Sequence, residues 1–229
     1  MIFQNRQQAG KQLVSKLEDY KNKNNVVVLG LPRGGVILSF EVAKALNLPM
    51  DLAVSRKISA PNNPEFAIGA IDENGYGIFD ESITASYGVT QEYIKEQEAI
   101  QKQEANRRLK LYRSGTAALK LHGKTVILVD DGIATGSTML AAIHSVKNKG
   151  AKQIIVAVPV TARDSLKKIQ KHVDQVVYLS APIFFNSVGS FYKEFPQTTD
   201  QEVINLILTN KKWMKDYLQP IPTRNLPRL

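Results

Sequence analysis

One stretch near the middle of the chain constrains the fold more than any other. Residues 125–129, Thr-Val-Ile-Leu-Val, form a short and mostly β-branched apolar run, which predicts a strand buried on both faces. Two adjacent carboxylates, Asp130 and Asp131, follow directly. A short loop then leads into residues 139–147, whose apolar periodicity predicts a helix.

Residues 132–138, between this strand and this helix, have the composition of a phosphate-binding loop. Two glycines permit backbone torsions that a Cβ would resist, and three hydroxyl side chains offer helix-capping groups. Such a loop directs several N–H groups at one point beside the positive end of a helix dipole, which favours a bound phosphate. Asp130 and Asp131 would repel that phosphate, so we expect them to accept hydrogen bonds from the vicinal hydroxyls of a ribose. The plain alternative is a turn followed by a helix cap.

The rest of the chain repeats the order of strand, loop and helix. Apolar runs predict strands at 26–30, 50–54, 154–158 and 175–179, and helical periodicity predicts helices at 7–20, 36–46 and 161–171. This order predicts an α/β fold with a doubly wound, mainly parallel sheet and helices on both faces. Ligands of such folds bind beyond the carboxyl ends of the strands.

Two stretches depart from that order. An Asn-Gly pair at 74–75 predicts a hairpin, and the polar pattern at 90–112 predicts a long helix with a solvated face. Beyond residue 180, the pattern predicts an aromatic-rich cap, a short helix at 202–208 and an extended arm from 211 onward. We therefore expect a single domain over 1–229, with a helical insertion at 76–120 and a C-terminal cap and arm at 181–229.

A second loop after a predicted strand is rich in glycine. Residues 31–35 read Leu-Pro-Arg-Gly-Gly, and the free N–H groups of Gly34 and Gly35 together with the guanidinium of Arg33 suit a polyphosphate. Taken alone, the segment could equally be a tight turn.

The segment at 55–66 contains two cations, two prolines and two asparagines. This composition argues against regular structure and predicts a long loop, of the kind that often closes over an active site.

The string of residues 126–138, Val-Ile-Leu-Val-Asp-Asp-Gly-Ile-Ala-Thr-Gly-Ser-Thr, closely resembles the 5-phosphoribosyl 1-pyrophosphate (PRPP) signature of type I phosphoribosyltransferases. The resemblance implies that Asp130 and Asp131 bind the ribose. It also implies that a loop binds the 5′-phosphate, formed by Ala134, Thr135, Gly136, Ser137 and Thr138. Ala134 stands where hypoxanthine-type members carry an aspartate, often taken as the general acid/base, whereas adenine-type members resemble this chain in having alanine.

The other loops acquire roles from the same resemblance. The loop with Arg33, Gly34 and Gly35 resembles the pyrophosphate-binding loop of that family. The segment at 55–66 occupies the position of a flexible loop that closes over PRPP. Catalytic roles fall there on Arg56 and Lys57, which would stabilise departing pyrophosphate, and on Glu65, a base or orienting group that could equally be a solvated side chain.

Aromatic residues gather after the last predicted strand. In purine-type relatives a clamp of backbone and aromatic groups holds the base near this point, which places Phe185 and Asn186 in the base-binding region. Aromatic residues in such a position also serve simply to pack a cap.

Composition limits the cellular setting. The chain has 30 basic and 21 acidic residues, a formal net charge of +9, and no cysteine. It therefore has no disulfide, thiolate nucleophile or zinc–thiolate site. Because no apolar run approaches the length of a bilayer span and the N-terminus lacks a signal-peptide pattern, we expect a cytoplasmic protein with no membrane partner.

These observations predict a phosphoribosyltransferase that transfers the 5-phosphoribosyl group of PRPP to a nucleobase-like nitrogenous acceptor and releases pyrophosphate. Mg²⁺ is expected as cofactor, bound mainly through PRPP and without a dedicated protein metal site. Relatives are commonly homodimers, and nucleic acid is not an expected partner. One alternative is a PRPP-sensing regulatory protein that binds nucleic acid without catalysis. Another is an α/β phosphate-binding protein unrelated to PRPP.

Overall fold

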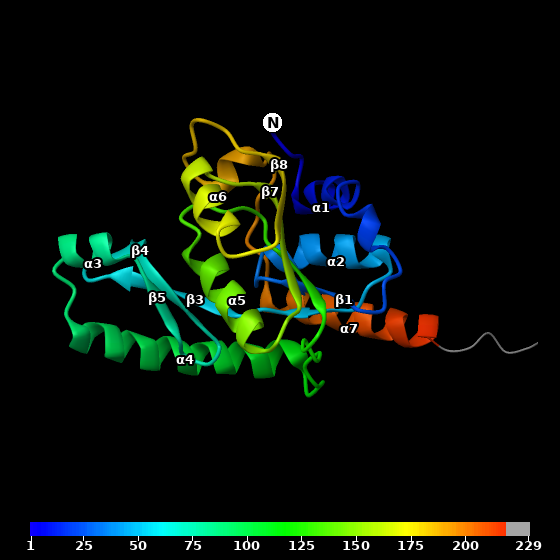
Figure 1. Cartoon of the computed structure of the whole chain (residues 1–229), viewed down its shortest axis with the longest axis horizontal. Coiled ribbons are helices and arrows are strands. Elements are labelled where there is room, and N and C mark those ends of the chain that lie inside the picture. Colours follow the sequence, from blue (N-terminus) through cyan, green and yellow to red (C-terminus); the bar gives the residue numbers. More distant parts are fainter. Residues whose placement is uncertain (219–229) are drawn as a thin grey trace, which may run out of the picture.

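The computed structural model describes residues 1–218, with all of their side chains except those of residues 64, 65 and 216–218. Within this part of the chain, a five-stranded sheet has the strand order β2-β1-β6-β7-β8, and all neighbouring strands are parallel (Figure 1). Its strands are β1 (Val26–Gly30), β2 (Met50–Leu52), β6 (Thr125–Val129), β7 (Gln153–Val160) and β8 (Gln175–Ser180). The α/β, doubly wound parallel fold predicted from the sequence is confirmed.

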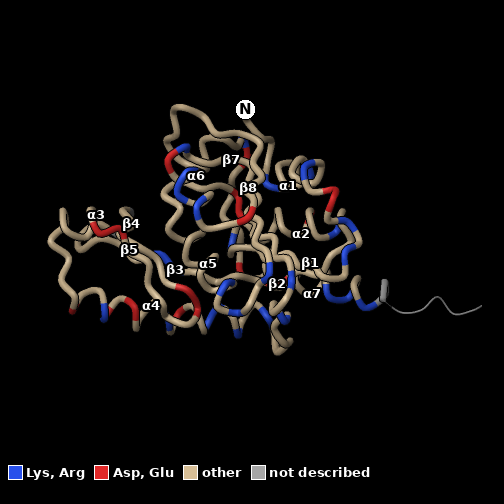
Figure 2. Tube along the Cα trace, in the orientation of Figure 1, with Lys and Arg blue, Asp and Glu red and all other residues tan. Residues whose placement is uncertain are grey.

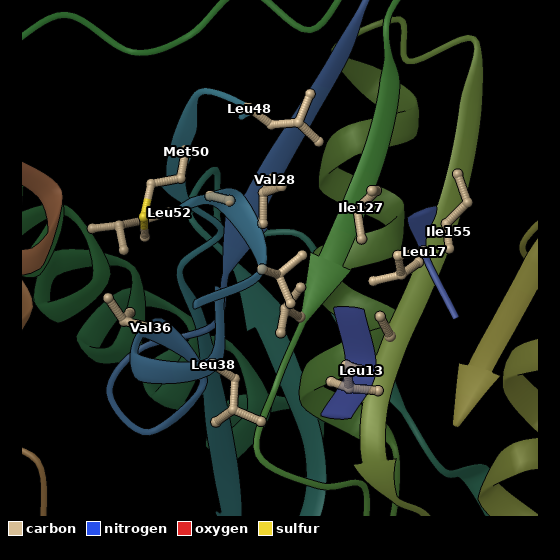
Figure 3. Close-up of a cluster of buried hydrophobic side chains, with 14 of the residues drawn as sticks. Leu13, Leu17, Val28, Val36, Leu38, Leu48, Met50, Leu52, Ile127 and Ile155 are labelled. Carbon is tan, nitrogen blue, oxygen red and sulfur yellow. The ribbon is translucent and has the colours of Figure 1, made fainter. Parts of the chain in front are cut away.

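Each central strand is buried on both faces because its alternate residues enter two different hydrophobic cores. Val28, Ile127 and Ile155 point to one core. Figure 3 shows this core, to which the helices on that side contribute Leu13 and Leu38. The neighbours of Val28, Ile127 and Ile155 along the strands enter the other core. The first face is covered by α1 (Arg6–Val14), α2 (Gly35–Leu46) and α7 (Asp200–Leu218), and the second by α5 (Ser137–Asn148) and α6 (Arg163–Gln170). None of the helices within residues 1–218 is both long and apolar enough to cross a bilayer.

The predicted loop at 55–66 is wrong, because these residues form most of a β-hairpin. Strands β3 (Ser55–Ala60) and β4 (Asn63–Asp72) pair antiparallel, with Ala60 opposite Asn63. Pro61 and Asn62 form the tight turn, where Asn62 has a φ of 60°, whereas the two cations lie within β3 and Asn63 begins β4. The strand is stable because Ile58 and Ala60 alternate into a small hydrophobic core of this sheet.

The hairpin belongs to a smaller unit that projects from the main sheet (Figure 1). Its sheet has the order β3-β4-β5, and β5 (Gly77–Phe79) pairs with β4 across the predicted Asn-Gly turn. Helices α3 (Glu81–Ser86) and α4 (Gln91–Arg113) complete it, and α4 confirms the long polar helix. The small sheet starts upstream of residue 76, so it includes more of the chain than the predicted insertion at 76–120.

Contacts with α5 hold this smaller unit in place. The ring of Tyr76 stacks on that of His144, with centroids 3.6 Å apart. The hydroxyl of Ser145 donates to Glu73 at 2.9 Å, and the same carboxylate forms an ion pair with Lys149. The start of β3 is thereby fixed beyond the carboxyl end of β2.

The terminal helices also differ from the prediction. The helix expected at 7–20 ends at Val14 and is followed by a 3₁₀ turn at Glu18–Tyr20. The short helix expected at 202–208 is the longer α7, so an extended arm from 211 is wrong as far as residue 218. Asn210 explains part of this extension, because its amide oxygen accepts a hydrogen bond from the N–H of Met50 at 2.9 Å on edge strand β2. The rest of the predicted arm, 219–229, lies outside the described residues.

Candidate functional site

The two predicted ligand loops meet at the carboxyl ends of β1 and β6. These strands pair in parallel with Gly30 opposite Val129, and the N–H of Leu31 donates to the carbonyl oxygen of Val129 at 3.0 Å. A Cβ on Gly35 would lie only 2.8 Å from Cα of Asp130, and a Cβ on Gly34 would overlap the carboxylate of Asp131. The glycines therefore permit direct contact between the 31–35 loop and the acidic pair. The Pro32–Arg33 peptide bond in this loop is cis.

The two carboxylates of the acidic pair are held in different ways. Asp130 accepts a hydrogen bond through Oδ1 from the N–H of Asp131 at 2.8 Å. Asp131 Oδ2 accepts from Nε of Arg6 at 2.7 Å, and its carbonyl oxygen accepts from the hydroxyl of Tyr192 at 2.6 Å. The orientation of Asp131 is therefore fixed by side chains from both ends of the chain.

Arg6 is a site residue that sequence reasoning missed. It is 7% exposed, its guanidinium lies 3.6 Å from the centre of the Phe195 ring, and Nη1 donates to the carbonyl oxygen of Pro196 at 2.6 Å. Arg6 is also the first residue of α1, where a positive charge opposes the helix dipole. That unfavourable position is the signal in the sequence that could have marked it.

Burial dominates the electrostatics of the acidic pair. It raises the pKa of Asp130 well above its usual value, with the neighbouring charge of Asp131 adding to the effect. Burial also raises the pKa of Asp131, although the Arg6 guanidinium opposes this shift. Burial raises the pKa of the Tyr192 hydroxyl as well, so Tyr192 remains a neutral donor to Asp131. Asp130 is therefore stabilised when its carboxyl group binds a proton or accepts hydrogen bonds from a ligand.

The predicted 5′-phosphate loop lies beside the acidic pair, at the N-terminus of α5. Gly136 adopts a φ of 84°, which allows the chain to turn into the helix at Ser137. Ala134 and Thr135 are exposed, and the hydroxyls of Thr135 and Ser137 lie 3.4 Å apart. Because the first N–H groups of a helix have no intrahelical partner, this end of α5 can bind an anion.

The remaining predicted residues are placed less directly. Arg33 lies 3.7 Å from the carboxylate of Asp200, at the start of α7. Arg56 is half-buried and donates from Nε to Gln101 of α4 at 3.0 Å, whereas Lys57 is exposed on the opposite face of β3. The catalytic role of Glu65 stays a prediction, because its side chain lies outside those the structure describes.

The predicted base-binding residues lie in the segment that follows β8. Phe185 packs on Phe191 with ring centroids 5.2 Å apart, and Asn186 is exposed. The same segment approaches the acidic loop, since a Cβ on Gly132 would lie 2.6 Å from the side chain of Val188. Base binding by Phe185 and Asn186 stays a prediction.

Residues 1–193 match a family profile described as the phosphoribosyl transferase domain. The chain belongs to the phosphoribosyltransferase family. This chain is similar to the crystal structure of protein TT1426 from Thermus thermophilus, with a sequence identity of 37% and a TM-score of 0.75. The match covers 91% of this chain and 99% of TT1426.

Curated relatives of this phosphoribosyltransferase-family chain include two proteins of Mycobacterium tuberculosis. Their names provisionally assign them as phosphoribosyl transferases, and each is 39% identical over 203 residues, or 89% of this chain. The match covers 46% of their length, so the chain spans about half of each of these relatives. An adenine phosphoribosyltransferase of Marinobacter nauticus is 43% identical over 70 residues, which cover 27% of this chain and 39% of that protein.

Proposed function

We propose that this chain transfers the 5-phosphoribosyl group of PRPP to a nitrogenous base and releases pyrophosphate. The observation that carries the proposal is the contact between the 31–35 loop and the Asp130–Asp131 pair, beside the N-terminus of α5. One edge of the sheet thus carries three kinds of group. The acidic pair can accept hydrogen bonds from a diol, the N-terminus of α5 can donate to a monophosphate, and the 31–35 loop suits a polyphosphate. PRPP contains these three groups on one ribose.

Each part of this edge has a distinct task in the proposed reaction. Asp130 and Asp131 accept hydrogen bonds from the ribose hydroxyls and hold the sugar in one orientation. As the bond from C1 to pyrophosphate breaks, positive charge develops on the ribose, and the nearby carboxylates favour that charge. Arg33 and the N–H groups of the 31–35 loop stabilise the negative charge on the leaving group.

The residues present fit a magnesium ion held mainly through the substrate. Among the side chains that the structure describes, no cluster of three or more His, Cys, Asp or Glu could hold a metal on its own. The carboxylate oxygens of Asp130 and Asp131 are ligands that Mg²⁺ accepts in company with phosphate oxygens. When bound, the ion would neutralise part of the charge on the phosphate oxygens.

Figure 2 shows Lys and Arg spread over several elements, among them α1, α4, α6 and α7. This spread favours transfer over a PRPP sensor that binds nucleic acid, for which a single basic stripe along one element is typical. The proposal also includes a nucleobase-like acceptor and a homodimeric state. It leaves Glu65 as the candidate base or orienting group.

The test of this function is turnover with a panel of nucleobases. The protein is incubated with PRPP, Mg²⁺ and one base at a time, and both pyrophosphate and the nucleoside monophosphate are measured. Equimolar release of the two products with one base is the expected result. Saturable PRPP binding without product on any base would instead favour the sensor.

Substitution of Gly35 by alanine tests the contact between the two loops. The new Cβ would lie 2.8 Å from both the Cα of Asp130 and the carbonyl oxygen of Val129, and neither backbone atom can yield easily. We expect a loss of about 1–3 kcal/mol in the free energy of unfolding, as for other overpacked sites. We also expect weaker PRPP binding, measured by calorimetry, because the 31–35 loop moves away from the acidic pair. Lys44→Ala, an exposed change in the same helix, is the control and should behave as wild type.

A further inference from the structure

A group of four arginines includes Arg33 of the 31–35 loop, and two of its members, Arg107 and Arg108, have no role in the proposed reaction. We call Arg33, Arg56, Arg107 and Arg108 the arginine cluster. Its members lie on the 31–35 loop, on β3 and on α4. Glu104 bonds two of its members, since Oε2 accepts from Nε of Arg107 at 2.6 Å and Oε1 accepts from Nε of Arg108 at 2.8 Å.

One face of α4 connects these arginines to the pyrophosphate loop. Tyr112, one turn beyond Arg108, donates its hydroxyl to Asp200 at 2.7 Å, and Asp200 is the residue that pairs with Arg33. At the other end, Gln101 accepts from Arg56. Residues spaced by three or four positions share a helix face, so these contacts follow one face of α4 from β3 to Asp200, the partner of Arg33, and end at the buried Tyr112.

Among the described side chains, positive charge is in excess around the arginine cluster. Two carboxylates, those of Glu104 and Asp200, pair with three of its four guanidinium groups, and the fourth, that of Arg56, is bonded to an amide. Hydrogen bonds from Arg107 and Arg108 lower the pKa of Glu104 to about 2, so it is ionised at neutral pH. Burial, with repulsion from Arg108, lowers the pKa of Arg56, whose bonded partner is a neutral amide. An anion that arrives here would meet several guanidinium donors whose positive charge is not fully balanced.

Pairing within one helix does not account for the whole arrangement. Pairs of Glu and Arg at i, i+3 and i, i+4 are common on exposed helices and stabilise them slightly. Here the Arg108 side chain is only 21% exposed, and Arg56 comes from a different element. Guanidinium groups gathered from separate elements suit a ligand with several phosphate oxygens, because each group can donate two parallel hydrogen bonds.

We propose that Arg108, together with Arg56 and Arg107, binds the pyrophosphate group of PRPP next to Arg33, and that Glu104 is an internal counter-ion that the pyrophosphate displaces. This inference rests on the proposed function for the identity of the ligand. It adds two arginines and a glutamate of α4 to the substrate site, and it assigns to Glu104 an effect opposite to that of the arginines. Glu104 competes with the ligand for the same donors.

The test is calorimetric titration of the folded full chain with inorganic pyrophosphate, PRPP and ribose 5-phosphate. Arg108→Met is expected to weaken pyrophosphate and PRPP binding by about 10- to 100-fold, the effect of losing a hydrogen-bonded charge. Glu104→Gln is expected to tighten pyrophosphate binding by about 3- to 10-fold, since it frees two guanidinium groups. Ribose 5-phosphate, which lacks the pyrophosphate, should bind all of these variants equally.

Lys110→Met is the matched control, because Lys110 is an exposed cation on the same helix and its loss changes the net charge equally. It should bind pyrophosphate within about twofold of wild type, since distant surface charges are screened. If Arg108→Met does not fold, the sign of the Glu104→Gln effect still decides, because a purely structural ion pair gives no tighter binding when it is broken.

The outcomes separate this inference from the proposed function. Wild type that binds PRPP, with pyrophosphate affinity unchanged in Arg108→Met and Glu104→Gln, overturns the inference alone. Binding of pyrophosphate that depends on Arg108, without binding of PRPP or ribose 5-phosphate, overturns the proposed function and supports the anion site. Binding of none of the three overturns both.

Discussion

Replacing Arg6 by methionine is expected to lower the free energy of unfolding by about 3–5 kcal/mol, the usual cost of breaking a buried ion pair from one side. Methionine preserves much of the length of the side chain but removes the guanidinium that bonds Asp131 at 2.7 Å. The carboxylate is then left buried next to Asp130 without a cation, and it must take up a proton or turn away. Denaturant-induced unfolding measures the loss, and calorimetry should show weaker PRPP binding as well.

Lys11→Met provides the control for this change. Lys11 lies on the same helix but is exposed, so its replacement should alter stability by no more than about 0.5 kcal/mol. An Arg6→Met variant as stable as the Lys11→Met variant would show that the pair with Asp131 is not formed in solution.

The second large effect is expected from Asp130→Asn, which should weaken PRPP binding by about 100-fold or more while making the protein more stable. The loss in binding follows because a neutral amide is a poorer acceptor for two hydroxyls than a carboxylate. The gain in stability follows because the folded state raises the pKa of Asp130, so that this carboxyl opposes folding at any pH above its unfolded pKa. One unit of such a shift corresponds to about 1.4 kcal/mol.

The pH dependence gives the sign of this effect. The carboxyl of Asp130 has a higher pKa in the folded protein than in the unfolded chain, where it is about 4. Its contribution to stability is present below the pKa of the unfolded chain and is lost as the pH rises through the pKa of the folded protein. The advantage of Asp130→Asn in thermal unfolding should therefore be present at pH 7 and vanish near pH 3. Asp131→Asn is the matched control, because the Arg6 guanidinium opposes the rise in the pKa of Asp131, so its replacement should give a smaller gain in stability at pH 7. A gain for Asp131→Asn as large as that for Asp130→Asn would contradict this account of the pair.

The sequence was sufficient to predict the two central strands and the edge of the sheet where the loops that follow them lie. Residues 26–30 and 125–129 are short apolar runs that can only be buried centrally, and parallel strands bring their carboxyl ends to one edge. The contact between Gly35 and Asp130 follows from that placement, even though these residues lie far apart in the chain.

Sequence reasoning failed where a role depends on a distant partner. The cations, prolines and asparagines of 55–66 suggested a loop. They gave no sign of the strand, because the core that stabilises Ile58 and Ala60 is supplied by β4 and by helices farther along the chain. Arg6 gave little warning of its contact with Asp131, which is 125 positions away. The arginines of α4 fitted a solvated helix face, since nothing local reveals that Tyr112 on that face reaches Asp200.

Calorimetric titration of the wild-type protein with PRPP in the presence of Mg²⁺, repeated on the Asp130→Asn, Asp131→Asn double variant, tests the central claim most directly. The account predicts saturable binding of PRPP to the wild type and loss of that binding in the double variant. Equal PRPP affinity in both proteins, or no binding to the wild type at millimolar PRPP, would contradict it.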